Sequence, residues 1–152
     1  MGLPMLKVLK KKNVDVTGHD IKNKNNFKKI KNCFIENKFS FFRQNEIIIS
    51  AVRDIKQTLE ICEGKNGLFQ FKEKKILIIS STLSPLFLKK LKSKAPKNIS
   101  LIDAPMSGAP MSAKNASLTF MIGCSKKQFE FILPLLKILG KQIKYIGSFG
   151  QG

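Results

Sequence analysis

The sequence is poor in the residue types that build most metal sites and disulfide frameworks. Its 152 residues include 3 cysteines and 1 histidine. Cys33, Cys62 and Cys124 lie far apart, form no C-x-x-C pair and are odd in number, so neither a zinc site nor a disulfide framework is indicated. His19 has no cluster of cysteines or carboxylates near it in the sequence, so a metal role is not favoured. We therefore expect reduced thiols, no bound metal and a cytoplasmic location.

The sequence also lacks a long apolar run. No segment approaches the roughly 20 apolar residues that a membrane-spanning helix needs. The N-terminus lacks the extended apolar core of a signal peptide. We therefore predict that the protein has no membrane partner.

Acidic residues are scarce: 28 Lys and Arg stand against 10 Asp and Glu, which gives a net charge of +18. Such a charge raises the possibility of a nucleic-acid-binding protein. However, the arginines are only Arg43 and Arg53, and the lysines are spread from Lys7 to Lys144. Proteins that bind phosphates usually concentrate their charge and use Arg for bidentate contacts. A compositional bias explains the lysines better, and nucleic-acid binding stays as the alternative function.

What the chain does contain is enough apolar material for one α/β domain, which we expect to span residues 1–152. Hydrophobic residues make up 43% of the sequence, and apolar runs typical of buried strands alternate with helical spacings. The predicted helices span residues 1–12, 21–36, 54–62, 84–94 and 125–139. The predicted strands span residues 14–20, 46–52, 75–81, 99–104, 118–124 and 142–146, and residues 39–42 are a short strand or a turn. Because strands alternate with helices, the sheet should be mostly parallel, with residues 46–52 as a central strand.

Three helix ends carry local signals. Ser84 is a predicted N-cap, with Pro85 in the first helical position where proline is tolerated. Ser125 is the predicted N-cap of the last helix. Gly140 is predicted to close that helix as a C′ residue.

The stretch from Leu101 to Ala109 is the most informative part of the sequence. Its apolar lead ends at Asp103 and breaks at Pro105, which leaves a turn of small residues at Met106–Ala109. Small residues let backbone N–H groups approach a bound anion closely. Taken alone, the stretch is either a ligand-binding turn or a plain turn after a strand.

The run DAPMSGAPMSAKNASLTFMIGC resembles the substrate-side signature of the β-hydroxyacid dehydrogenases, the family of 3-hydroxyisobutyrate dehydrogenase, tartronate semialdehyde reductase and 6-phosphogluconate dehydrogenase. The family pattern reads D-A-P-V-S-G-G, a short insert, and G-T-L-T-I-M-V-G-G. Ala109 and Ala116 stand where that pattern has glycine. Other segments align in the same order along the chain: MGLPM at the N-terminus, Ser81–Pro85, Gly140–Lys141 and Gly147–Gly152.

This resemblance implies the α/β Rossmann-like fold of an NAD(P)-binding domain: a doubly wound, mostly parallel sheet in three layers. It also implies that the family's first strand should precede Met1, and that a helical domain, through which the family oligomerises, should follow Gly152. We therefore expect the chain to be a fragment of a longer reading frame that lacks both parts.

The resemblance assigns the cofactor to the first helix and to the loop ending at Asp20. Gly2 would be the last glycine of a G-x-G-x-x-G turn, which holds a pyrophosphate on a helix N-terminus, with Leu3 and Pro4 beside it. Asp20 would accept the adenosine ribose hydroxyls and repel a 2′-phosphate, which favours NAD over NADP. Lys22 and Lys24 leave that discrimination open, and an exposed strand-end carboxylate is the alternative for Asp20.

Further cofactor residues are expected after two of the predicted strands. Ala51, Val52 and Arg53 align with the family's M-L-P turn over the cofactor, although Arg53 stands where the family often has proline. Thr82 resembles the family residue near the nicotinamide ribose. The alternatives are a solvated helix-start residue for Arg53 and a helix N-terminal hydroxyl for Thr82.

The resemblance assigns the substrate to Ser107, Gly108 and Ala109. Ser107 and Gly108 match the pair that anchors a small hydroxy acid, because a hydroxyl with neighbouring N–H donors suits a carboxylate. The implied activity is transfer of a hydride between a small hydroxy acid and NAD. No catalytic residue is expected within the chain, because the family's proton-transferring lysine would lie just beyond Gly152, and the chain alone is expected to be inactive.

Overall fold

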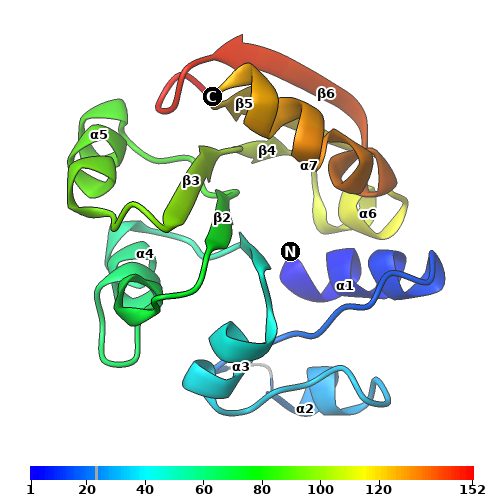
Figure 1. The fold of residues 1–152 in the computed structure, drawn as a ribbon. Helices are drawn as coiled ribbons and strands as arrows, with labels where there is room; N and C mark the ends of the chain where they lie inside the picture. Colours follow the sequence, from blue (N-terminus) through cyan, green and yellow to red (C-terminus); the bar gives the residue numbers. More distant parts are fainter. Residues whose placement is uncertain (23) are drawn as a thin grey trace.

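The computed structural model describes residues 1–22 and 24–152 and shows an α/β domain built on a six-stranded sheet (Figure 1). The strands are β1 (Ile47–Ser50), β2 (Lys75–Ile79), β3 (Ile99–Asp103), β4 (Met106–Ser107), β5 (Leu118–Gly123) and β6 (Gly140–Gly147). The α-helices are α1 (Gly2–Lys11), α2 (Lys24–Lys28), α3 (Lys38–Gln44), α4 (Ile55–Cys62), α5 (Pro85–Lys94), α6 (Pro110–Lys114) and α7 (Lys126–Leu139), and a 3₁₀ turn spans Leu68–Gln70. Among the helices of these residues, none combines the length and the apolar character needed to cross a membrane.

The sheet is mixed and mostly parallel. Strands β1, β2 and β3 are parallel neighbours, and β6 is parallel to β5. Strand β5 joins β3 through one antiparallel pair, Asp103 with Gly123, and also pairs antiparallel with the short β4. Parallel pairing follows from the helical crossovers α4 and α5, which return the chain to the same end of the sheet. The predicted doubly wound α/β class is confirmed.

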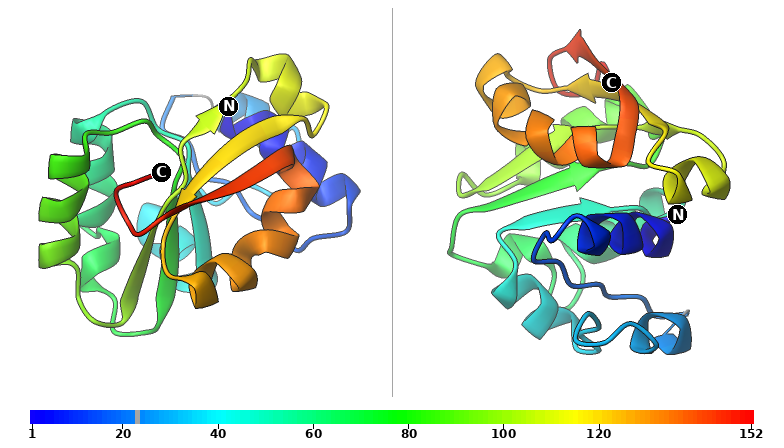
Figure 2. Two further views of the ribbon diagram at one scale, coloured as in Figure 1. Left: turned by 90° about the horizontal axis from the view of Figure 1, so that it is seen from above. Right: turned by 90° about the vertical axis from the view of Figure 1, so that its right-hand side faces the viewer.

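Helices cover both faces of the sheet, which gives three layers (Figure 2). Alternate side chains of β2 enter different cores, because successive residues of a strand point to opposite faces. Ile78 lies in the first core, together with α1 and α7 residues such as Met5 and Leu136. Leu77 lies in the second core, together with Leu88 of α5 and its neighbours. The nearly continuous apolar run of β2 is therefore explained by burial on both faces.

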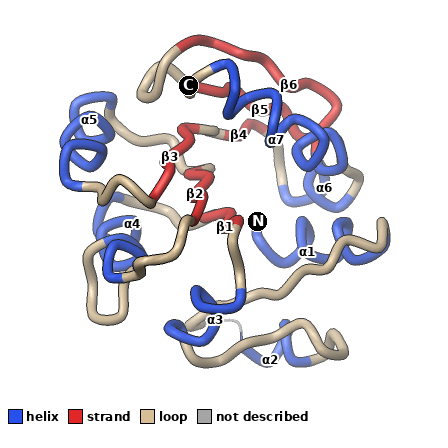
Figure 3. Tube along the Cα trace, viewed as in Figure 1, coloured by secondary structure: helices blue, strands red, loops and turns tan. Residues whose placement is uncertain are grey.

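The strand predicted over residues 14–20 does not form. This segment is drawn as a loop in Figure 3, and within residues 1–22 and 24–152 its ladder contact is limited to an isolated parallel bridge between Gly18 and Phe34. A strand needs a neighbour along its length, and among the described residues this segment meets only that short one. Thr17 instead exchanges side-chain hydrogen bonds with Asn45, at 3.2 and 2.9 Å.

The prediction that residues 46–52 form a central strand is also wrong in part. The strand exists as β1, but among the described residues it pairs only with β2 and lies at the end of the sheet. One face of β1 is that of an interior strand, because Ile48 and Ser50 are buried, whereas Ile47 on the other face is 36% exposed and Ile49 is half-buried. A strand that is open along one edge is a position where a further strand could add.

Residues 39–42 belong to helix α3 and not to a strand. Asn37 caps this helix, and its side chain accepts a hydrogen bond from the Ser40 N–H at 2.9 Å. Packing of Phe42 against the second core overrides the strand preference of the phenylalanines.

Other boundaries differ from the sequence prediction. Of the helix predicted over residues 21–36, only α2 is helical within the described residues, and position 23 lies outside them. Gly140 does not close α7 as a left-handed C′ residue, because its φ of −142° is extended and it begins β6 directly. The helix α6 was not predicted.

The N-cap of α7 is expected to stabilise the fold measurably. Ser125 Oγ accepts the Gln128 N–H at 3.3 Å, and the Gln128 side chain accepts the Ser125 N–H at 3.0 Å. Replacing Ser125 with alanine should therefore lower the free energy of unfolding by about 1 kcal/mol, as measured by urea denaturation. Ser84→Ala is the matched control, because Ser84 caps α5 without a side-chain hydrogen bond. An equal effect of both substitutions would contradict this account.

Candidate cofactor and substrate site

The carboxyl ends of the parallel strands β1, β2 and β3 lie along one edge of the sheet, where open α/β sheets bind ligands. Two of the residues predicted to contact a cofactor, Arg53 after β1 and Thr82 after β2, line the same open hollow of about 370 Å³. Lys56 of α4 lines it too. The structure therefore brings together the two strand-end loops that the sequence analysis singled out.

Hydrogen bonds tie these two loops to each other. The Ser81 hydroxyl donates to the Val52 carbonyl at 2.5 Å, and the Ser80 N–H donates to the Ser50 carbonyl at 2.9 Å. Ala51 and Val52 are half-buried between these contacts. The loop after β1 is thus held in place by the loop after β2.

Arg53 lies at the start of α4 with an exposed side chain. Its backbone N–H donates to Gln57 Oε1 at 2.9 Å, while Asp54 caps the helix by accepting the Gln57 N–H at 2.8 Å. Within the described residues, the Arg53 guanidinium forms no ion pair. The guanidinium can therefore bind an anion in the hollow. Its exposure also agrees with the alternative, a solvated residue at the start of a helix.

The N-terminus of α1 has the features of an anion site. Gly2 begins the helix, and no heavy atom of the described residues outside its own helix and its chain neighbours would lie within 4 Å of a Cβ placed on it. The helix has no side-chain cap and no acidic residue in its first turn. The N–H groups of Gly2 and Leu3 therefore lack intrahelical partners, and Pro4 has no N–H to satisfy. A phosphate group is the ligand that such a helix end attracts.

Two buried hydroxyls at the carboxyl edge have no hydrogen-bond partner among the described residues. These are the Oγ atoms of Ser50, at the end of β1, and Ser80, directly after β2. A buried hydroxyl without a partner is costly, and such groups are often satisfied by water or a ligand. Together with the open end of α1, they fit a polar, anionic cofactor at this edge. Sequence reasoning gave neither serine hydroxyl a role, because a serine at the end of a strand carries no signal by itself.

Asp20 lies in a loop and not at the end of a strand. Its carboxylate accepts the Lys22 N–H at 2.8 Å, which orders the turn around it. The neighbouring His19 stacks on Phe41 with ring centroids 5.7 Å apart, and its Nδ1 lies 3.0 Å from the Ile35 carbonyl. His19 therefore anchors the loop, and no group of metal-binding side chains occurs within the described residues.

The predicted substrate residues lie on β4 and directly after it. Ser107 pairs with Thr119 of β5, and Ala109 precedes the first residue of α6. Gly108 has a φ of +140°, and a Cβ there would lie 2.9 Å from Ser112 Cβ, so the position requires glycine. All of Ser107, Gly108 and Ala109 are exposed.

Helix α6 connects this loop to the predicted cofactor helix. It packs directly against α1, as the blue and yellow helices in Figure 1 show. Two predicted sites that are about 100 residues apart in the sequence therefore meet through one helix contact.

Asp103, at the end of β3, is a further polar residue of this edge that the sequence analysis did not assign to a role. Its side chain is only 2% exposed and accepts the Gly152 N–H at 2.9 Å. Burial raises the pKa of this carboxyl above its ordinary value, and backbone hydrogen bonds from Gly152 and Gly150 oppose that shift in part. An acidic residue that ends an apolar strand was the signal that could have identified it.

Known proteins that are similar to this chain identify its family. The sequence model described as the NAD binding domain of 6-phosphogluconate dehydrogenase matches residues 1–147. The chain is 31% identical to the 2-(hydroxymethyl)glutarate dehydrogenase of Eubacterium barkeri, over 100% of this chain and 52% of that protein.

Solved structures agree in fold. A 3-hydroxyisobutyrate dehydrogenase of Mycobacterium tuberculosis, crystallised with L-serine, has a TM-score of 0.87 and 22% identity over 100% of this chain and 53% of its own. A variant imine reductase of Myxococcus stipitatus in complex with NAD⁺ also has a TM-score of 0.87, with 17% identity over 100% of this chain and 52% of its own. The chain thus spans about half the length of these proteins.

Proposed function

The chain belongs to the family of the NAD binding domain of 6-phosphogluconate dehydrogenase, and from this premise we propose that it is the cofactor-binding part of an NAD-dependent oxidoreductase for small hydroxy acids. The members of this family are NAD(P)-dependent oxidoreductases that act on hydroxyl groups. The observation that carries the proposal for this chain is the N-terminus of α1, which has no side-chain cap. Helix α1 also contacts α6, the helix that follows the predicted substrate loop.

In this proposal each part of the edge has one task. The N–H groups of Gly2 and Leu3 bind the cofactor pyrophosphate, with Pro4 fixing the helix start. Asp20 accepts the ribose hydroxyls, Arg53 supplies a cation over the hollow, and Thr82 contacts the nicotinamide ribose. NAD, when bound, supplies the hydride chemistry.

The substrate we propose is a small hydroxy acid like 3-hydroxyisobutyrate. The Ser107 hydroxyl and the backbone N–H groups of Gly108 and Ala109 would bind its carboxylate. The name of the Eubacterium barkeri relative, a dehydrogenase of a hydroxymethyl acid, supports this substrate class. No residue of this chain is given the proton-transfer role in this proposal.

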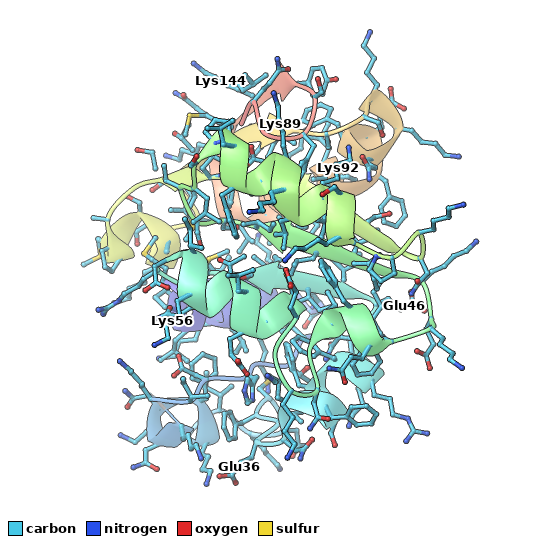
Figure 4. All side chains as sticks on the ribbon, turned by 90° about the vertical axis from the view of Figure 1, so that its left-hand side faces the viewer. Glu36, Glu46, Lys56, Lys89, Lys92 and Lys144 are labelled. Atoms are coloured by element: carbon cyan, nitrogen blue, oxygen red, sulfur yellow. The ribbon has the colours of Figure 1, made fainter. Side chains whose placement is uncertain are left out.

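The high positive charge does not favour a nucleic-acid interface. Lys56 extends from α4, Lys89 and Lys92 from α5, and Lys144 from β6 (Figure 4), so the lysines are distributed over several elements. Some lysines are also paired, as in the ion pair of Lys38 with Glu60. We propose a cytoplasmic location, because Cys33, Cys62 and Cys124 are all free thiols buried in the fold.

Cofactor titration tests this function directly. NADH is expected to bind more tightly than NADPH, because Asp20 accepts ribose hydroxyls and repels a 2′-phosphate. Asp20→Ala should weaken NADH binding by about 1–3 kcal/mol, the value of a charge-assisted hydrogen bond, and should narrow or invert the preference. Fluorescence titration with each nucleotide measures both effects.

Asp15→Ala is the matched control, since Asp15 is an exposed aspartate in the same loop and its loss changes the net charge equally. It should leave both affinities unchanged. Tighter binding of NADPH by the chain with Asp20 intact would overturn the assignment. Equal losses in the two variants would show that only overall charge matters.

A further inference from the structure

Asp103 lies where three parts of the chain meet. It is the last residue of β3, pairs with Gly123 of β5, and contacts Gly152 of the turn formed by Gly147–Gly152. The C-terminal end of the chain lies beside β5 in Figures 1 and 3. Among the described residues no lysine, arginine or histidine forms an ion pair with Asp103, and its carboxylate is held by the backbone N–H of Gly152.

The Gly147–Gly152 turn is held by contacts with the rest of the fold and by its own hydrogen bonds. Phe149 is 7% exposed and packs in the second core, where Lys92 of α5 lies 5.3 Å from the centre of its ring. The Gln151 Oε1 atom accepts the Ser148 N–H at 2.7 Å, and the Cys124 N–H donates to the Gly147 carbonyl at 2.8 Å. The start and middle of the turn are therefore fixed by packing and by local hydrogen bonds.

The end of the turn depends on Asp103. Gly152 N–H donates to Asp103 Oδ2 at 2.9 Å. A Cβ on Gly152 would lie 2.8 Å from the Met121 carbonyl and 3.0 Å from Asp103 Oδ2, so the backbone here touches both β5 and the carboxylate. No other side chain of the described residues offers an acceptor to Gly152.

We propose that Asp103 is a positioning residue, whose ionised carboxylate fixes the end of the Gly147–Gly152 turn across the ends of β3 and β5. The same residue begins the short connection to β4, and the Pro105 carbonyl accepts the Met121 N–H at 3.1 Å on the same strand β5. The turn and the Ser107–Ala109 loop are thus held against one strand. The consequence for catalysis rests on the proposed function: Asp103 sets the position of the turn relative to the substrate loop.

A charged carboxylate at this position costs stability. Burial raises the pKa of Asp103, so the stability that its protonated form contributes is present below the ordinary carboxyl pKa and is lost as the pH rises through the raised value. The nearby thiol of Cys124 also has a raised pKa through burial and stays neutral over this range. If Asp103 served packing alone, an ionisable carboxyl group would not be needed at this position.

The test uses nuclear magnetic resonance and thermal unfolding of the 152-residue chain. In Asp103→Asn the side chain keeps its shape, but a neutral amide oxygen accepts the Gly152 N–H less strongly than a carboxylate does. At neutral pH, amide exchange at Gly152 should become about tenfold faster, because the charge-assisted hydrogen bond is weakened. At the same pH the midpoint of thermal unfolding should rise by about 2–4 °C, because the buried charge is gone.

Two further measurements separate positioning from a structural role. In the unmodified chain the Gly152 amide proton resonance should move downfield as the pH rises through the Asp103 ionisation, and in Asp103→Asn it should not. Gly152→Ala should speed exchange at Gly150 while leaving Asp103 in place, because its methyl group displaces the turn. Asp15→Asn, at an exposed aspartate, should change neither signal.

The proposal is overturned if Asp103→Asn leaves Gly152 exchange unchanged, or if the Gly152 resonance does not titrate. A lower unfolding midpoint together with unchanged exchange would assign Asp103 a packing role only. None of these measurements requires a nucleotide. A failure of NADH binding would therefore refute the proposed function without touching this result, and the reverse also holds.

Discussion

Replacing Phe120 with alanine is expected to lower the free energy of unfolding by about 3–5 kcal/mol. Phe120 is fully buried on β5 and packs in the first core with residues such as Ile102 and Leu136. Its strand pairs with both β4 and β6, so the cavity would open at the centre of this half of the sheet. Urea denaturation followed by circular dichroism measures the change.

Phe131→Ala provides the matched control for this loss. The same ring is removed from α7, but Phe131 is 61% exposed, so the free energy of unfolding should change by less than about 0.5 kcal/mol. A loss of similar size in both variants would contradict the burial seen for Phe120. An unchanged midpoint in Phe120→Ala would show that β5 is not part of the cooperative core.

The 152-residue chain alone is expected to produce no NADH above a buffer control when it is incubated with NAD and a panel of 3-hydroxy acids. Ser107, Gly108 and Ala109 are exposed, so the described residues do not enclose a substrate or exclude water from it. The proposed function gives the proton-transfer role to no residue of this chain, and general acid–base catalysis typically contributes about 10²–10⁴-fold in rate. Loss of substrate orientation lowers the rate further.

A full-length relative such as the Eubacterium barkeri dehydrogenase, assayed with its own substrate, serves as the positive control. NADH formation in proportion to the concentration of the 152-residue chain would show that its own residues suffice for catalysis. The assignment of the proton-transfer role outside the chain would then be wrong.

The substrate and cofactor residues show how far sequence reasoning reaches at a site. Gly2, Arg53, Thr82 and Ser107 were selected through the resemblance to family motifs, and the structure places them at a helix start, in the loops after β1 and β2, and on β4. Their roles stay predictions. The sequence could not show that the buried hydroxyls of Ser50 and Ser80 lack a partner among the described residues, because a missing hydrogen-bond partner is a property of the packed structure.

Some elements were determined by the sequence alone because their causes are local. Strand β2 follows from a run of apolar residues that suits burial on both faces. The start of α7 follows from Ser125 and Gln128, which are three positions apart and form the capping box by themselves. The mostly parallel sheet follows from the alternation of strands and helices along the chain.

Only the tertiary structure decided the elements whose causes are distant in sequence. Residues 14–20 have a strand-like pattern, but a strand exists only when a neighbour pairs with it, and in the part of the chain that the structure describes the pairing is limited to the bridge between Gly18 and Phe34. Asp103 looks like an ordinary strand-end carboxylate until the chain returns 49 positions later to give it the Gly152 N–H. Pairing and burial depend on which segments meet in space, and for these residues the local pattern contains no information about that meeting.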